Sequence, residues 1–371
     1  MKTALLKDPA LPTERVGGLG VLERQLFLLR RAGFERAFVG APRPDGRLRL
    51  PEGLELSWDA AAGSVPAPYL EVSGRHLVRL AALKEASSGG PARWLDESGE
   101  AVLAVVGAGA DRPLPPGASV RLENPLRGGP ADAWLMREAV KGTDGFMARH
   151  FDRHISLAVT RLLLDTRVTP NLMTVASTAV GLCGAGLLAL GTYRFGLAGA
   201  LLVWLHSTLD GCDGELARLR FQESPLGGVL DFWGDNLVHA ALFLCLGAGV
   251  ARATGARMPV FLGLAAAASA SASAALAYAH SKRKAASRAA SGPFFAGVAE
   301  VAADAADGEK RLAAVEDTLA QRDFVYLLVA LAAGDRLGWF LWASAVGSPL
   351  FLAVLLWLRR PRGLSRTSEF V

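Results

Sequence analysis

Two patterns of hydrophobic and polar residues divide the chain near residue 168. Before that point, short apolar runs such as Thr3–Leu6, Ala37–Val39 and Ala101–Val106 alternate with turns rich in Gly and Pro, and Val21–Ala32 has a helical pattern. Short β-prone runs bounded by turn residues are typical of strands in an α/β domain. The sequence therefore predicts a soluble α/β domain over residues 1–135.

A segment of mixed character, residues 136–167, follows this domain. From residue 145 onward, Phe, Met, Ile, Leu and Val alternate with arginine and histidine. Such a helix can lie along a membrane surface, with its apolar face among acyl chains and its arginines among lipid phosphates. An amphipathic helix packed on the N-terminal domain would show the same pattern, so both interpretations stay open.

Long apolar runs begin after Pro170 and dominate residues 168–371. A membrane-spanning helix needs about 20 mostly apolar residues. Six runs approach this length, namely 171–191, 195–213, 228–250, 258–280, 322–340 and 341–358. Asp335 and Arg336 interrupt the fifth run. We expect an α-helical integral membrane domain with six transmembrane helices.

The basic residues predict the orientation of this domain. With the N-terminus inside, the clusters around Arg220, Lys282–Lys284 and Arg359–Arg362 all lie in cytosolic segments, and the outer loops carry fewer basic residues. Cytosolic loops of membrane proteins are enriched in Lys and Arg. The first residues contain no apolar stretch typical of a signal peptide. We therefore expect a multi-pass cell-membrane protein with both termini in the cytosol.

Composition narrows the possible partners. Hydrophobic residues make up 51% of the chain and charged residues 20%, with a formal net charge of only +5. A modest charge spread beside apolar runs suits anionic lipid headgroups better than nucleic acid. The three cysteines, Cys183, Cys212 and Cys245, lack metal-ligand spacing and are interpreted as small core residues.

Four aspartates at the edge of the apolar runs carry the candidate chemistry. Asp210 and Asp213 are three residues apart, Asp231 and Asp235 are four apart, and each pair therefore lies on one helix face. Ser224 and the proline after it can reverse the chain between the two helices. Since an ionisable group at bilayer depth costs about 2.5–3.5 kcal/mol on insertion scales, these carboxylates need partners.

Divalent cations are the natural partners of four converging carboxylates. Mg²⁺ and Mn²⁺ prefer oxygen ligands, and two such ions suit a substrate that carries a pyrophosphate. Glycines at 211, 214, 227 and 228 leave room for a nucleotide or a facing helix. In the alternative interpretation, Asp210 or Asp213 forms a buried ion pair with Arg218 or Arg220, which explains at most two of the four carboxylates.

The pattern that runs from Asp210 through Gly214, Ala217 and Arg218 to Asp235 resembles the signature of the CDP-alcohol phosphotransferase family, also called the CDP-alcohol phosphatidyltransferases. The resemblance covers roughly residues 165–358 and includes Thr169–Asn171 and Thr174. It implies six transmembrane helices, a frequently dimeric assembly and an active site that opens to the cytosolic leaflet.

The resemblance also implies roles for individual residues. Asp210, Asp213 and Asp231 would bind the divalent metals, and Asp235 would be the general base or a further metal-associated carboxylate. The CDP moiety would contact Asn171, Thr174, Gly214, Ala217 and Arg218. CMP would leave as the acceptor hydroxyl attacks. His206, one turn before Asp210, is interpreted either as a residue of a helix interface or as a contact to the donor.

The acceptor is less well defined by the sequence. Lys282 and Arg283 follow the fourth run, and Arg322 opens the fifth. These residues can bind the phosphate of an acceptor such as inositol phosphate, or they can simply anchor the helices at lipid headgroups. Both interpretations stay open.

Segments including Gly142–Phe146 and Arg153–Ser156 resemble a subgroup that joins an inositol-1-phosphate cytidylyltransferase domain to a di-inositol phosphate phosphate synthase. The N-terminal domain resembles a degenerate form of that nucleotidyltransferase fold. Asp8–Pro12 replaces the Gly-rich loop that cradles a triphosphate. Ser73–His76 stands where a metal-binding Asp is expected. We expect that this domain does not synthesise CDP-inositol.

Several partners fit these observations. The donor is expected to be CDP-diacylglycerol, which gives a phospholipid, or CDP-inositol, which gives a di-inositol phosphate, and the protein is expected to form a homodimer among membrane lipids. A cation-binding membrane transporter is the alternative from a different class, because carboxylates in a membrane also bind transported cations.

Overall fold

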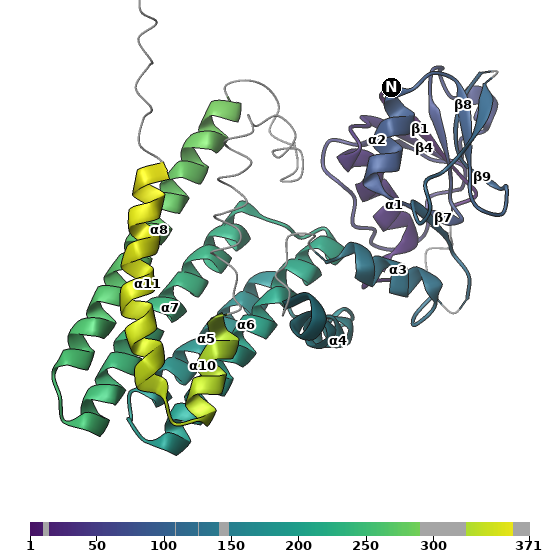
Figure 1. The fold of residues 1–371 in the computed structure, drawn as a ribbon. Coiled ribbons are helices and arrows are strands. Elements are labelled where there is room, and N and C mark those ends of the chain that lie inside the picture. Colours follow the sequence, from purple (N-terminus) through teal and green to yellow (C-terminus); the bar gives the residue numbers. More distant parts are fainter. Residues whose placement is uncertain (10–14, 108, 125, 141–147, 290–323, 359–371) are drawn as a thin grey trace, which may run out of the picture. The chain divides into compact units, whose positions relative to one another are not determined.

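The computed structural model describes residues 1–9, 15–107, 109–124, 126–140, 148–289 and 324–358 (Figure 1). The chain forms two compact units. The N-terminal unit contains Met1–Val140 together with two short later segments, Arg161–Thr166 and Glu215–Gln222. The helical unit contains Lys141–Thr160, Arg167–Gly214 and Glu223–Val371. Each unit is described by itself.

The N-terminal unit is built on a mixed seven-stranded sheet with the order β10-β8-β9-β6-β1-β4-β5. Its strands are β1 (Thr3–Lys7), β4 (Arg36–Val39), β5 (Glu55–Ser57), β6 (Leu70–Ser73), β8 (Ala92–Leu95), β9 (Ala101–Val105) and β10 (Ala110–Pro113). Strand β1 is parallel to both β4 and β6, whereas β9 is antiparallel to both β6 and β8. Two small antiparallel pairs complete the strands, β2 (Arg15–Val16) with β3 (Leu19–Gly20) and β7 (His76–Val78) with β11 (Ser119–Arg121).

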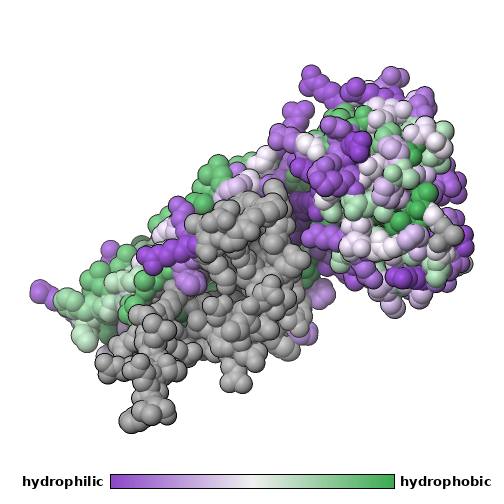
Figure 2. Space-filling model, turned by 90° about the horizontal axis from the view of Figure 1, so that it is seen from above, coloured by the Kyte–Doolittle hydropathy of each residue, from purple (hydrophilic) through white to green (hydrophobic). Residues whose placement is uncertain are grey.

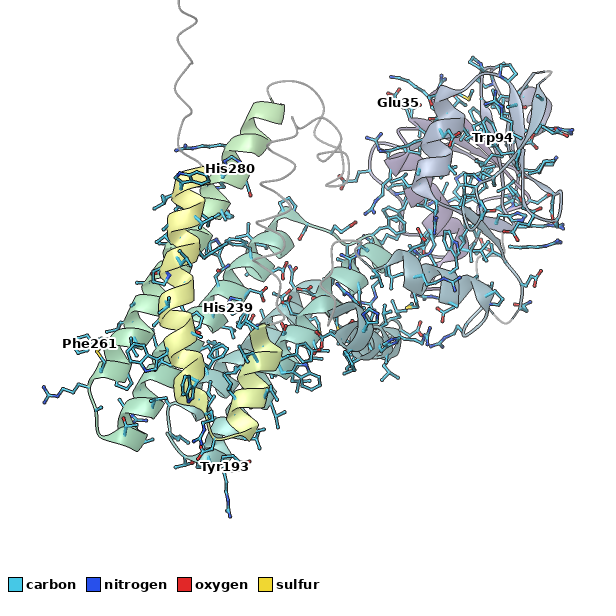
Figure 3. All side chains as sticks on the ribbon, in the orientation of Figure 1. Glu35, Trp94, Tyr193, His239, Phe261 and His280 are labelled. Carbon is cyan, nitrogen blue, oxygen red and sulfur yellow. The ribbon has the colours of Figure 1, made fainter. Side chains whose placement is uncertain are left out.

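Three helices accompany the sheet, α1 (Val21–Arg31), α2 (Leu80–Ser88) and α3 (Pro130–Glu138), with a 3₁₀ turn at Ala62–Ser64. The core consists of buried aliphatic residues of β1, β4, β6 and β9 together with Leu26 and Leu29 of α1, and Trp94 of β8 is also buried (Figure 3). The predicted strands at Thr3–Leu6, Ala37–Val39 and Ala101–Val106 and the helix at Val21–Ala32 are confirmed within one or two residues.

The helical unit consists of five long apolar helices and one shorter one, α10, among the residues that the structure describes (Figure 1). They are α5 (Pro170–Leu188), α6 (Tyr193–Arg220), α7 (Pro225–Thr254), α8 (Met258–Ala289), α10 (Phe324–Ala333) and α11 (Leu337–Leu358). A π-helical turn at Ala148–Asp152 leads into α4 (Arg153–Leu163). The last turns of α4 and α6 belong to the N-terminal unit.

Five of these helices, α5, α6, α7, α8 and α11, are long and apolar enough to cross a membrane. The predicted boundary between the fifth and sixth spans, at residues 340 and 341, is wrong. Helix α10 ends at Ala333, and α11 begins at Leu337. The break falls at Asp335, which has a positive φ of 54°, because the charged pair Asp335–Arg336 ends the apolar run there. The start of the predicted fifth span, including Arg322, lies outside the described residues.

Exposed apolar side chains cover much of the helical unit. Large hydrophobic residues more than half exposed include Phe261, Trp339, Trp342, Val346 and Trp357. Figure 2 shows hydrophobic surface on this unit, and Phe261 lies at the outer edge of the helices in Figure 3. Such an extent of exposed apolar surface marks contact with lipid. The unit is therefore a multi-pass membrane domain.

Helix α4 and the turn before it have the inverse of the usual burial pattern. Asp152, Ser156 and Thr160, spaced four residues apart, are buried, whereas Phe151 and Ile155 are exposed. In water the apolar side would be buried instead. Phe151 and Ile155 therefore face outward, but Arg161–Thr166, which include the end of this helix, belong to the N-terminal unit, so the helix at the membrane surface stays a prediction.

Candidate active site

The four aspartates lie on two consecutive helices. Asp210 and Asp213 lie in the C-terminal half of α6, and Asp231 and Asp235 lie in the first three turns of α7. Ser224 caps α7, because its Oγ accepts a hydrogen bond from the Gly227 N–H at 3.0 Å. Proline at the first helical position suits the same helix start. The predicted reversal between two carboxylate-bearing helices is thus confirmed.

Three of the four carboxylates meet. Asp210, Asp231 and Asp235 each offer an oxygen atom, and these atoms lie within 4.8 Å of one another. Asp210 is only 4% exposed, and the other two are half-buried. Three carboxylates this close repel one another when ionised, and a divalent cation with oxygen ligands relieves that repulsion. The donor set therefore fits Mg²⁺ or Mn²⁺.

Asp213 is held from the neighbouring helix α5. The buried Thr174 hydroxyl donates a hydrogen bond to Asp213 Oδ2, and it also lies 3.2 Å from the Pro170 carbonyl oxygen. Thr174 is expected from the resemblance to contact CDP, and the structure places its hydroxyl on an aspartate instead of in open space. Its position fits a residue that orients a metal-binding carboxylate.

The remaining residues expected to contact CDP lie on α5 and α6. Asn171 lies against the start of α7, since a Cβ added to Gly227 would be 3.0 Å from Asn171 Oδ1. Gly214 and Ala217 are half-buried on α6. Arg218 donates from its Nε to the Ala139 carbonyl oxygen at 2.7 Å within the N-terminal unit.

His206 is a helix-interface residue that also reaches Asp235. The ring is 3% exposed, and its Nδ1 lies 2.9 Å from the Ser177 carbonyl oxygen of α5. A carbonyl oxygen only accepts, so Nδ1 carries the hydrogen. The other nitrogen, Nε2, lies 3.5 Å from Asp235 Oδ1. His206 thereby links α5 to the carboxylate expected to act as the base.

Sequence reasoning missed Asp152. Its Oδ1 accepts hydrogen bonds from Thr208 of α6 at 3.1 Å and from Tyr326 of α10 at 2.6 Å. Asp152 is buried, and Thr208 is two residues from Asp210. The spacing of Asp152, Ser156 and Thr160 along one helix face is a signal that could have identified it.

Of the three residues considered for the acceptor phosphate, the structure describes Lys282 and Arg283. Lys282 and Arg283 are exposed near the end of α8, and the Lys282 ammonium lies 5.4 Å from the centre of the Tyr278 ring on the same helix. Arg322 lies outside the described residues. The structure neither brings the two exposed residues to the carboxylates nor assigns them a ligand.

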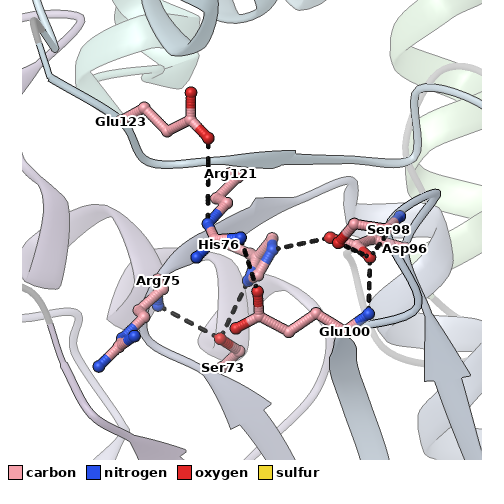
Figure 4. A network of polar contacts seen from close by, with 8 residues as sticks. All are labelled: Ser73, Arg75, His76, Asp96, Ser98, Glu100, Arg121 and Glu123. Atoms are coloured by element: carbon pink, nitrogen blue, oxygen red, sulfur yellow. Dashed lines mark hydrogen bonds and ion pairs between the residues drawn. The ribbon is translucent and has the colours of Figure 1, made fainter.

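A second polar cluster lies in the N-terminal unit (Figure 4). The buried His76 has Nδ1 3.0 Å from Ser73 Oγ and Nε2 3.3 Å from Asp96 Oδ2. Glu100 lies close enough to share a cation with His76 and Asp96, but it pairs with Arg121 at 3.1 Å. Since both ring nitrogens already have protein partners, this cluster is a structural hydrogen-bond network.

Asp96 is the best-satisfied carboxylate of that network. Partial burial alone would raise its pKa, but hydrogen bonds from the Ser98 hydroxyl, the Glu100 and Ser98 N–H groups and His76 outweigh burial and hold the Asp96 pKa below its ordinary value. The hydroxyl contact is 2.7 Å long and the Glu100 N–H contact 2.8 Å long. The folded structure therefore favours the ionised form of the Asp96 carboxyl group.

A multi-pass membrane domain with carboxylates clustered between its helices defines the class of this protein. Residues 167–348 match the family model described as CDP-alcohol phosphatidyltransferase, so this part of the chain is a CDP-alcohol phosphatidyltransferase domain. The resemblance seen in the aspartate pattern is confirmed, and the family is one of transferases.

Curated relatives agree with this assignment. A protein of Rubrobacter xylanophilus named bifunctional IPC transferase and DIPP synthase is 40% identical over 191 residues, which is 49% of this chain and 41% of the relative. A Thermococcus kodakarensis protein of the same name is 48% identical over 113 residues, 30% of this chain and 25% of the relative. These matches span less than half of each relative's length.

Phosphatidylinositol phosphate synthase of Mycobacterium tuberculosis is 32% identical over 100 residues, which is 26% of this chain and 44% of the relative. The crystal structure of that enzyme with CDP-DAG bound is similar to 58% of this chain and 100% of its own, at 24% identity and a TM-score of 0.37.

Proposed function

We propose that this protein transfers a phosphatidyl or phosphoalcohol group from a CDP-linked donor to an alcohol acceptor and releases CMP. The observation that carries the proposal is the convergence of Asp210, Asp231 and Asp235 within 4.8 Å inside the matched family domain. The donor is CDP-diacylglycerol or CDP-inositol. The relatives named above favour an inositol-containing product, a phospholipid or a di-inositol phosphate.

The chain's residues divide the chemistry between them. Asp210, Asp231 and Asp235 hold divalent cations, Mg²⁺ or Mn²⁺, with Asp213 beside them and oriented by Thr174. When bound, these ions neutralise pyrophosphate charge and polarise the phosphorus that is attacked. Asn171, Gly214, Ala217 and Arg218 lie along the CDP moiety. Lys282, Arg283 and Arg322 are candidates for an acceptor phosphate.

Asp235 removes the proton from the acceptor hydroxyl. The acceptor oxygen forms a bond to the phosphorus that carries the donor alcohol, and the bond from that phosphorus to the bridging oxygen breaks. CMP leaves with the electron pair. His206, 3.5 Å from Asp235, orients this carboxylate. The site opens toward the cytosol, and the protein works as a homodimer with both termini on the cytosolic side.

The N-terminal unit does not supply CDP-inositol. Strand β1 ends at Lys7 and continues into Asp8 and Pro9, without glycines at its end. At the end of β6, the Ser73 hydroxyl contacts His76 where the fold resemblance would place a metal-binding aspartate. These features support a domain without nucleotidyltransferase activity.

The decisive experiment measures CMP release by the purified full chain. Each donor, CDP-diacylglycerol or CDP-inositol, is tested with each acceptor, inositol or inositol phosphate. Every combination is measured with Mn²⁺, with Mg²⁺ and after chelation of the metal. We expect CMP from at least one donor only when a metal is present. Asp235→Asn is expected to slow release about a hundredfold or more, because general-base catalysis contributes about 10²–10⁴-fold.

Two further arms separate the competing classes. CTP with inositol phosphate is expected to yield no pyrophosphate, and cation flux into liposomes is expected to equal that of empty liposomes. Flux without CMP release would identify a transporter and overturn the proposal. A wild-type rate in Asp235→Asn would remove the assigned base.

A further inference from the structure

Helix α6 ends in an unusual way within the N-terminal unit. Gln222 N–H donates to the Ala217 carbonyl oxygen at 2.8 Å, and Phe221 N–H donates to the Arg218 carbonyl oxygen at 3.4 Å. Phe221 has a positive φ of 52°. This is a Schellman ending, in which the left-handed position is usually glycine because a side chain is unfavourable there. A phenylalanine at this position needs compensating contacts.

Two arginines from the N-terminal domain cap the last carbonyl groups of α6. Arg24 of α1 donates to the Leu219 carbonyl oxygen at 2.7 Å. Arg49 donates from its two terminal nitrogens to the carbonyl oxygens of Arg220 and Phe221 at 2.5 and 2.6 Å. Cations at a helix C-terminus interact favourably with the helix dipole and satisfy carbonyls that have no partner within the helix.

The Phe221 ring is held by the same surface. It stacks on Phe27 with the ring centres 5.1 Å apart and the planes 21° apart. The guanidinium of Arg31 lies 4.4 Å from the ring centre, and that of Arg24 lies 5.5 Å away. Stacking and cation–π contacts of this kind offset the backbone strain at Phe221. We call Arg24, Phe27, Arg31 and Arg49, together with the Phe221 that they contact, the α6 clamp.

The central arginine of the clamp is buried and does not lie on the surface. Arg24 is 2% exposed, and burial, assisted by the nearby positive charge of Arg31, lowers the Arg24 pKa to about 10. A charge taken out of water at such a site is stabilised by the three carbonyl oxygens that it contacts, those of Val16, Gly17 and Leu219. The last turn of α6 supplies one of these three.

The clamp acts on the helix that carries two of the motif aspartates. Asp213 precedes Leu219 by six residues on a continuous helix, an axial distance of about 9 Å at 1.5 Å per residue. A helix is stiff over this length, so fixing its C-terminal end also limits its rotation and axial shift at Asp213 and Asp210. Carboxylates that bind metals lose affinity when their positions are relaxed.

We infer that the contacts at the C-terminal end of α6 help to position the carboxylates that this helix carries, and that Arg49 and Phe221 are positioning residues for Asp210 and Asp213. The inference rests on the proposed function for its catalytic consequence, but its first consequence is on cation binding. Loosening the clamp is expected to weaken Mn²⁺ binding without removing any carboxylate.

Isothermal titration of the full chain with Mn²⁺ tests this inference. Arg49→Ala and Phe221→Gly are compared with wild type. Asp213→Asn, which lacks one carboxylate of α6, is the reference for direct loss of a carboxylate. Glycine is the preferred residue at a left-handed helix end, so Phe221→Gly removes the ring while keeping the cap. Both clamp variants are expected to raise the Kd for Mn²⁺ about threefold to tenfold, less than the roughly tenfold to hundredfold effect of residues that contact a metal ligand directly, because the clamp acts through the helix.

Arg47→Ala is the matched control, because Arg47 is exposed in the same loop as Arg49. It is expected to keep the wild-type Kd. Lysine has a single ammonium group and cannot contact both carbonyl oxygens as the two terminal nitrogens of Arg49 do. The Kd of Arg49→Lys is therefore expected to lie between those of Arg49→Ala and wild type. Wild-type Kd values in both clamp variants, at unchanged Tm and elution volume, would overturn the inference. A reduced CMP rate with an unchanged Kd would also overturn it.

The two hypotheses fail separately. If the wild-type chain binds Mn²⁺ but releases no CMP from either donor, the proposed function is lost while the Kd comparison still decides the role of the clamp. If CMP is released normally and the Kd does not move, the transfer chemistry stands and the clamp only holds the fold together.

Discussion

Two side chains from the helix contacts approach the motif aspartates. Thr174 and His206 both lie at helix contacts, and each places a polar group on a carboxylate, Thr174 on Asp213 and His206 on Asp235. Neither residue is a strong metal ligand in this arrangement. Residues that orient ligands are tested by the affinity and geometry of the site and not by loss of charge.

Thr174→Val removes the hydroxyl that donates to Asp213 while keeping the side chain's shape. We expect CMP release per unit of enzyme to fall about tenfold to a hundredfold, as for other residues that orient metal ligands, and the Mn²⁺ requirement to rise. Initial rates across a Mn²⁺ titration check this expectation. Thr174→Ser retains the donor and should stay close to wild type; equal behaviour of the Val and Ser variants would contradict the assigned hydrogen bond.

Among the elements, helices α5 and α7 approach each other through backbone atoms. A Cβ added to Gly249 would lie 2.0 Å from the Leu188 carbonyl oxygen, and one added to Gly191 would lie 2.4 Å from the Gly249 carbonyl oxygen. Small residues allow this proximity, which strengthens helix association in lipid. The close contact sets the spacing of the two helices whose other ends carry Thr174, Asp231 and Asp235.

Gly249→Ala should separate these helices, because the atom it meets belongs to the backbone and cannot rotate away. We expect a loss of about 1–3 kcal/mol, typical of overpacking, and a lower Tm in detergent. Gly186→Ala on α5 is the matched control, since a Cβ at Gly186 meets nothing within 4 Å. Equal Tm values for the two variants would show that the helices do not pack as described.

At the scale of the whole molecule, the N-terminal unit is assembled from three separate stretches of chain. The segments Arg161–Thr166 and Glu215–Gln222 return to it from the helical part of the sequence. Arg220 joins them, since its guanidinium donates to the carbonyl oxygens of Leu164 at 2.8 Å and Thr166 at 3.1 Å. Residues 1–140 alone therefore lack part of the structure that completes this unit.

The acid stability of the N-terminal unit depends on Asp96. Its pKa in the folded state lies below the ordinary value of 3.8, so ionised Asp96 stabilises the fold above about that pH, and the contribution is lost as the pH falls through the lower folded-state pKa. We expect Asp96→Asn to unfold more readily than wild type at pH 7. Amide hydrogen exchange of residues 92–105 in the full chain, measured from pH 7 to pH 3, reports the stability of this unit separately from that of the helical unit.

The difference between the two proteins should shrink as the pH falls toward 3, because protonated Asp96 and asparagine are alike in charge. A difference that stays constant across this range would mean that the charge of Asp96 does not contribute. Glu97→Gln, at a neighbouring exposed position, is the control and should follow wild type throughout.

Much of the architecture could be predicted from the sequence because it depends on local pattern. The strands at the start of the chain, the long apolar helices and the reversal at Ser224 follow from residue periodicity and capping. The spacing of Asp210, Asp213, Asp231 and Asp235 predicted two carboxylate faces and a family resemblance, and residues 167–348 match the model of that family. Cys212 is buried as predicted, but Cys183 is exposed and Cys245 is half-buried, so the prediction that all three cysteines are core residues is wrong for Cys183.

Tertiary structure alone decided which groups meet. Thr174 contacts Asp213, Tyr326 contacts Asp152, and Arg49 contacts the end of α6 across separations of 39, 174 and up to 172 residues. No local pattern encodes such pairs, since each depends on how whole helices pack and on which carbonyls a helix end leaves without partners. The sequence by itself determined where the four aspartates lie on their helices and so predicted their chemistry, and packing determined which residues contact them.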